Sequence, residues 1–142
     1  MKIYTYYENV NFKKQKELLN LWSQSWENNG FSTSILNRDD AKKSNLYNDY
    51  YNFIQRVHDK VSGKELPENG YWLAAQLEIV AFTSVTSPSY ISDYDIINRN
   101  FNDTHEVSPQ LHWRDSCCSC FASGDSKSWE NYVVFLIEHE DM

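Results

Sequence analysis

The sequence contains little of what marks disordered, fibrous or membrane-spanning proteins. Of its 142 residues only 4 are glycine and 3 are proline, so a low-complexity or disordered chain is not expected. It has no apolar run of about 18 residues, the length that a membrane span requires. Its first residues lack the apolar stretch of a secretory signal. We therefore expect one folded domain over residues 1–142, cytoplasmic and without membrane contact.

The cysteines are few and badly spaced for a structural role. Cys117, Cys118 and Cys120 are odd in number and crowded into four positions. Neighbouring residues of a strand do not readily form an unstrained disulfide, and the paired C-x-x-C units of a zinc site are missing. Three reduced thiols are the favoured interpretation, with a redox or metal role as the alternative.

The charge balance and the missing motifs exclude several function classes. With 20 acidic and 13 basic residues the formal net charge is -7, which argues against nucleic acid as a partner. The glycine-rich phosphate loops and the G-x-S-x-G nucleophile elbow are absent. A classical dinucleotide enzyme, a P-loop ATPase and a serine hydrolase are therefore not expected. Aromatic residues make up 15% of the chain, which predicts a core and a pocket rich in rings.

The apolar pattern predicts an α/β fold. Residues 3–7 read as a strand, a helix follows with Leu18, Leu19, Trp22 and Trp26 on one face, and 31–36 read as a second strand. Such a strand–helix–strand unit favours parallel pairing. The expected later elements are helices over 46–61 and 71–82, strands over 90–98, 111–113 and 117–122, and a helix capped by Asp125 or Ser126. We expect a single α/β domain with a mostly parallel sheet flanked by helices.

Two carboxylates lie in the predicted strand over 90–98. Alternate residues of a strand face the same side, so Asp93 and Asp95 are expected to point the same way and grip one cation. Mg²⁺ and Mn²⁺ prefer hard oxygen ligands, commonly one or two carboxylates completed by phosphate oxygens. The alternative is a solvated acidic pair at the edge of the sheet.

This arrangement resembles the GT-A-fold glycosyltransferases that use nucleotide-diphospho-sugars. The likeness covers about residues 2–101: the opening Ile-Tyr-Thr-Tyr-Tyr-Glu at 3–8, Leu19-x-x-Trp22-x-x-x-Trp26, and the apolar helix over 71–82 followed by a turn and the D-x-D motif. The resemblance implies a GT-A-like fold that binds a nucleotide-sugar and transfers the sugar to an unknown acceptor. It implies that Asp93 and Asp95 carry the Mn²⁺ or Mg²⁺ and the diphosphate. Thr5, Tyr6 and Tyr7 would lie near the nucleobase and ribose.

Other interpretations remain open at this point. A short, acidic and aromatic chain also suits a non-catalytic module for a protein partner, such as an inhibitor or adaptor. A metal-dependent phosphohydrolase could use the same two aspartates. The polar residues Asp103, His105, Glu106 and His112 follow the motif and could supply a catalytic base or be ordinary loop residues.

Overall fold

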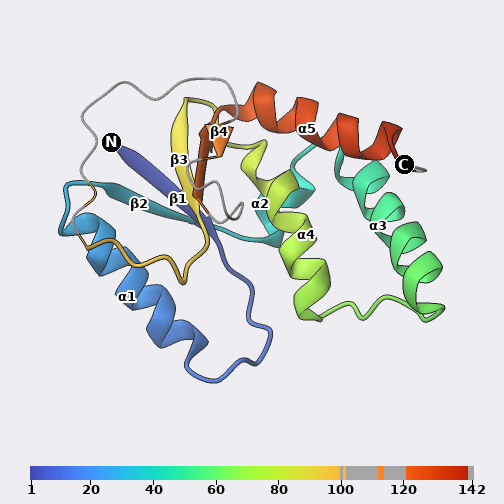
Figure 1. The fold of residues 1–142 in the computed structure, drawn as a ribbon, viewed down its shortest axis with the longest axis horizontal. Coiled ribbons are helices and arrows are strands. Elements are labelled where there is room, and N and C mark those ends of the chain that lie inside the picture. Colours follow the sequence, from blue (N-terminus) through green and yellow to red (C-terminus); the bar gives the residue numbers. More distant parts are fainter. Residues whose placement is uncertain (100, 102–111, 114–120, 141–142) are drawn as a thin grey trace.

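The described strands form one five-stranded sheet in the order β2-β1-β3-β5-β4 (Figure 1). The computed structural model describes residues 1–99, 101, 112–113 and 121–140. The strands are β1 (Lys2–Tyr6), β2 (Ser32–Leu36), β3 (Ser89–Ser92), β4 (His112–Trp113) and β5 (Phe121–Gly124). The helices are α1 (Gln15–Glu27), α2 (Arg38–Lys42), α3 (Tyr47–Ser62), α4 (Tyr71–Phe82) and α5 (Ser126–Glu138). The prediction of a single α/β domain is confirmed.

The sheet is mixed, which corrects the expectation of a mostly parallel one. β1 pairs in parallel with β2 on one side and with β3 on the other. β5 pairs antiparallel with β3, and β4 pairs antiparallel with β5. The strand–helix–strand pattern correctly predicts the parallel part, because a parallel neighbour requires a long crossover. The direction of the two short strands is decided by where the chain returns to the sheet, which their apolar pattern does not encode.

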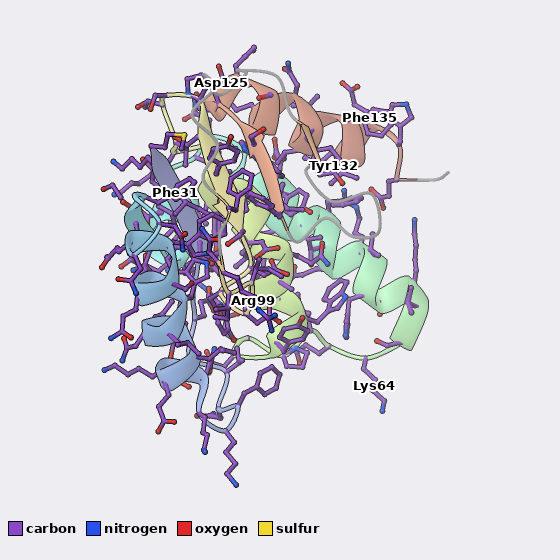
Figure 2. All side chains as sticks on the ribbon, turned by 60° about the vertical axis from the view of Figure 1, so that its left-hand side comes forward. Phe31, Lys64, Arg99, Asp125, Tyr132 and Phe135 are labelled. Atoms are coloured by element: carbon purple, nitrogen blue, oxygen red, sulfur yellow. The ribbon has the colours of Figure 1, made fainter. Side chains whose placement is uncertain are left out.

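Helix α1 covers one face of the sheet (Figure 1). The apolar cluster on this face consists of Ile3, Leu19, Trp22, Trp26, Phe31 and Tyr90. The rings of Phe31 and Trp26 meet edge to face with centroids 4.9 Å apart. Phe31 lies beside α1 and the strands, whereas the exposed Lys64 extends away from the body of the molecule (Figure 2). The helical spacing of tryptophan and leucine in α1 thus predicts its buried face correctly.

Helix α4 belongs to the cluster on the opposite face, together with side chains of α3 and α5. Leu73, Leu77 and Val80 of α4 are fully buried, as expected for a helix that is apolar nearly all round. Trp129 of α5, 2% exposed, packs its ring 5.1 Å from that of Phe82. The two faces are therefore reached by different crossovers: α1 links β1 to β2, and α2–α4 link β2 to β3.

Strand β3 is shorter than the predicted strand over 90–98. Its parallel pairing with β1 covers only Tyr90 and Ile91, and the strand ends at Ser92. The chain then turns, and the amide of Ile96 donates a hydrogen bond to the carbonyl of Asp93 over 3.1 Å. Asp93 and Asp95 therefore lie in a turn, and the argument from alternating strand residues is wrong.

Several predictions fall outside the described residues. They concern the thiols of Cys117, Cys118 and Cys120 and the polar residues Asp103, His105 and Glu106. Only the backbone of His112 and Trp113 is described, as the short strand β4. Within the described ranges no helix combines the length and the apolar composition that crossing a membrane requires.

Candidate functional site

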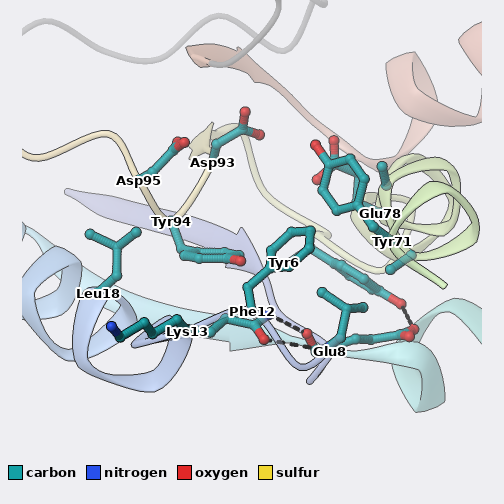
Figure 3. A pocket seen from close by; sticks show the side chains of 14 residues that line it. Tyr6, Glu8, Phe12, Lys13, Leu18, Tyr71, Glu78, Asp93, Tyr94 and Asp95 are labelled. Carbon is teal, nitrogen blue, oxygen red and sulfur yellow. Dashed lines mark hydrogen bonds between the residues drawn. The ribbon is translucent and has the colours of Figure 1, made fainter. Parts of the chain in front are cut away.

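A pocket of about 350 Å³ lies at the carboxyl ends of β1 and β3 (Figure 3). The chain after β1 and the turn after β3 both line it, with Glu8 from the first and Asp93 from the second. The crossover from β1 goes to one face of the sheet and the crossover into β3 comes from the other. In open α/β sheets ligands bind where crossovers diverge in this way. The topology alone therefore marks this pocket as the candidate site.

One wall of the pocket is a single stripe of α4. Tyr71, Ala74, Ala75 and Glu78 line it, at the 3- and 4-residue spacing that puts side chains on one helix face. The two alanines occupy little volume, so the stripe leaves space between the helix and the end of the sheet. Glu78 is the one charged residue of α4 and faces this space.

Aromatic rings supply much of the remaining wall. Tyr6 at the end of β1 and Tyr94 in the turn after β3 both line the pocket, as do Phe12 and Tyr71. The rings of Phe12 and Tyr71 lie 5.3 Å apart, and both side chains are more than half exposed. Flat apolar walls with a few polar groups are typical of small-molecule sites.

Besides Glu8, three more carboxylates line the pocket. They are Asp93, Asp95 and Glu78, and their carboxylate groups accept no hydrogen bond from the part of the chain that the structure describes. Ser92 Oγ donates only to the backbone carbonyl of Asp93. Burial and then the charge of Asp95 raise the pKa of Asp93 to about 6. Burial and then the charges of Asp93 and Asp95 raise the pKa of Glu78 to about 8. Ionising these carboxyl groups together is therefore costly in the folded state, and a bound cation would offset that cost.

The raised pKa of Glu78 predicts a stability change with pH. Its neutral form is favoured in the folded state, so its contribution to folding is full below the ordinary pKa of 4.5 and is lost as pH rises through about 8. Glu78→Gln keeps a neutral group of similar shape. We expect it to raise the free energy of unfolding at pH 9 by about 1 kcal/mol or more, since one pKa unit equals about 1.4 kcal/mol.

Urea unfolding at pH 4.5 and pH 9 measures this effect. Glu65→Gln, which changes an exposed glutamate in the α3–α4 loop, is the matched control and should leave the pH dependence unaltered. Equal stability of Glu78→Gln and wild type at both pH values would contradict the burial argument.

The segment after β1 is held by an arginine of α2. Arg38 donates from Nε and Nη2 to the two carboxylate oxygens of Glu8, each over 3.0 Å. Its Nη1 donates to Glu68 Oε1 over 2.7 Å, and Tyr6 Oη donates to the Glu8 carboxylate. The side chains of Arg38 and Glu8 are 16% and 14% exposed. This network ties the pocket wall to α2 and to the α3–α4 loop.

The structure brings together only part of the predicted site. Asp93, Asp95 and Tyr6 line the pocket. Tyr7 lies beside it, with its ring 5.6 Å from that of Tyr94. Thr5 is fully buried, lines no part of this pocket, and its hydroxyl has no hydrogen-bond partner among the described residues. Its side chain points to the face opposite that of Tyr6, because neighbours on a strand alternate.

Sequence reasoning missed Glu78, Glu8 and Arg38. A signal for Glu78 exists in the sequence, because it is the single charge in the apolar stretch 71–82. Burying an unpaired charge is costly, so a lone glutamate in an apolar helix indicates a special environment. No comparable local signal marks Arg38, which lies 30 residues from both of its carboxylate partners.

Asp93 and Asp95 are the pocket residues whose chemistry would suit a hard divalent cation. Among the described residues no group of three or more histidine, cysteine, aspartate or glutamate side chains is arranged to hold a metal ion. Asp93 and Asp95 would supply two carboxylates, and Mg²⁺ is commonly bound by one or two carboxylates with the remaining positions taken by substrate phosphates and water.

Comparisons with family models, with curated proteins and with solved structures found no match for this chain. The assignment of a function therefore depends on the pocket itself.

Proposed function

We propose that this chain binds a nucleoside diphosphate sugar together with Mn²⁺ or Mg²⁺ and transfers the sugar to an acceptor. The observation that carries the proposal is the position of Asp93 and Asp95. Both line a ring-walled pocket at the carboxyl end of β3, next to the point where the crossovers diverge. This edge of an α/β sheet is where nucleotides bind. The resemblance to GT-A glycosyltransferases supports the same assignment.

The residues have distinct roles in this proposal. Asp93 and Asp95 would hold the cation, which neutralises the diphosphate and makes it a better leaving group. Tyr6 and Tyr94 are the rings nearest the ends of β1 and β3, and they would contact the base and ribose. In the transfer the bond between the anomeric carbon and the diphosphate oxygen breaks, and the diphosphate leaves with the bonding electrons. The same carbon forms a bond to the oxygen of an acceptor hydroxyl, whose proton is released to water.

Ligand-dependent stability tests the proposal. Thermal unfolding is measured with Mn²⁺ and each of UDP, GDP, ADP and their glucose conjugates. A ligand at 100 times its dissociation constant stabilises the folded state by about 2.7 kcal/mol, and the increase should require the cation. If no nucleotide shifts the unfolding temperature with Mn²⁺ present, the proposal is wrong and an interaction module becomes the better interpretation.

A variant that fills the pocket shows whether binding occurs there. Ala75 is half-buried and lines the pocket on α4, so Ala75→Leu should occupy the space without disturbing the core behind it. We expect nucleotide affinity to fall at least about 10-fold, or 1.4 kcal/mol, while the unfolding temperature without ligand stays close to that of wild type. Unchanged affinity would place the ligand elsewhere.

A further inference from the structure

Helix α1 hydrogen-bonds to the chain on both sides of Asp93 and Asp95. Trp22 donates from its indole to Ser92 Oγ over 2.8 Å. Trp26 donates from its indole to the carbonyl of Ile96 over 2.9 Å. These two contacts join residues 70 positions apart in the sequence. They flank the two aspartates, one immediately before Asp93 and one immediately after Asp95.

A third contact from α1 holds the end of the segment 93–98. Ser25 Oγ accepts a hydrogen bond from the amide of Asn98 over 3.0 Å and donates to the carbonyl of Trp22 over 2.9 Å. The Asn98 side chain in turn accepts from the amide of Phe101 over 2.7 Å. Trp22, Ser25 and Trp26 lie one helical turn apart on the buried face of α1, so one rigid element supplies all three contacts.

These contacts replace the strand ladder that ends at Ser92. Ladder bonds to β1 no longer hold residues 93–98, and the turn places both aspartates on the pocket. The indoles and Ser25 are at most 9% exposed. Buried hydrogen bonds of this kind are costly to leave unmade, so they select one backbone conformation.

We infer that Trp22, Ser25 and Trp26 are positioning residues, which fix the turn 93–98 so that Asp93 and Asp95 converge on one cation. The inference rests on the proposed function for its metal and on the hydrogen bonds for its geometry. Groups that orient metal ligands from behind commonly change metal affinity by about 10- to 100-fold when they are removed.

Trp22→Phe and Trp26→Phe test the inference, because phenylalanine keeps a ring in the core and removes the N–H donor. Each should weaken binding of Mn²⁺, added alone and followed by the paramagnetic resonance of the free ion, by about 10-fold. Leu19→Ala is the matched control. Leu19 lies on the same buried face of α1 and in the same cluster, so its loss should lower the urea midpoint and leave Mn²⁺ affinity unchanged.

Hydrogen exchange provides a readout that needs no metal. The amides of Ile96 and Asn98 should exchange faster in Trp26→Phe than in Leu19→Ala when the two are compared at equal stability. If the tryptophan variants lose stability but keep both the Mn²⁺ affinity and the exchange rates of wild type, their role is only structural and the inference is wrong. If wild type binds no Mn²⁺, with or without UDP, GDP or ADP, both the proposed function and the metal-positioning role are wrong. The hydrogen-exchange rates would then show only whether the tryptophans stabilise the turn 93–98.

Discussion

Asp93→Asn and Asp95→Asn are each expected to lower the affinity for a Mn²⁺–nucleotide complex by about 100-fold, or 2.7 kcal/mol. Asparagine keeps the size of aspartate and removes the charge that attracts the cation. The two carboxylates line the same pocket and accept no side-chain hydrogen bond from the described residues, so no ion pair or hydrogen bond with those residues is broken. Isothermal titration with the nucleotide that stabilises wild type measures the loss.

Folding should survive these two changes. The pKa of Asp93 is raised to about 6 by burial and by the charge of Asp95. Ionised Asp93 is therefore less stable in the folded state than in the unfolded chain, and Asp93→Asn should not destabilise the fold. Asp59→Asn, an exposed change on α3 with the same loss of charge, is the control and should leave affinity unaltered. Wild-type affinity in both site variants would remove the metal role from Asp93 and Asp95.

Arg38→Met is expected to destabilise the protein by about 3 kcal/mol. The change leaves Glu8, at 14% exposure, without the guanidinium that binds both of its oxygens. Removing one partner of a largely buried ion pair costs several kcal/mol because the remaining charge is uncompensated. Methionine keeps most of the apolar volume of the arginine side chain, so the decrease in the free energy of unfolding measures the lost ion pair. Urea unfolding at pH 7 measures it.

A double-mutant cycle separates the ion pair from packing. Arg38→Met combined with Glu8→Gln should recover part of the loss, since glutamine carries no charge to leave unpaired. Lys43→Met removes an ion pair to Asp40 in which the lysine is 72% exposed, and it should cost at most about 0.5 kcal/mol. Additive effects of the Arg38 and Glu8 substitutions would show that their contact contributes nothing to folding.

Periodic segments of the sequence predict the elements of this fold well. The apolar run after Gly70 predicts α4 at its observed bounds, and the strand–helix–strand pattern predicts the parallel pairing of β1 and β2. The prediction of a strand over 90–98 is wrong for a specific reason. Its β-branched residues Ile96 and Ile97 look like a strand, but the carbonyl of Ile96 is bound by the indole of Trp26, which competes with strand pairing.

The candidate site, like the fold, was only partly predictable from the sequence. The D-x-D spacing selects Asp93 and Asp95, which both line the pocket, although the strand geometry used to justify the prediction is wrong. Which face of the sheet Thr5 and Tyr6 point to depends on the register of β1. Of the three residues predicted to contact the ligand, Tyr6 lines the pocket, Tyr7 lies beside it and Thr5 is buried in the core.

The sequence by itself determines the element order, the buried face of α1, the apolar character of α4 and the net negative charge, because each depends on local spacing or on composition alone. Only the tertiary structure decides that α4 brings Glu78 to Asp93, that Arg38 holds Glu8, and that α1 fixes the turn after β3. These contacts join residues from 15 to 70 positions apart. Their partners are selected by packing across the sheet, which no single stretch of the chain encodes.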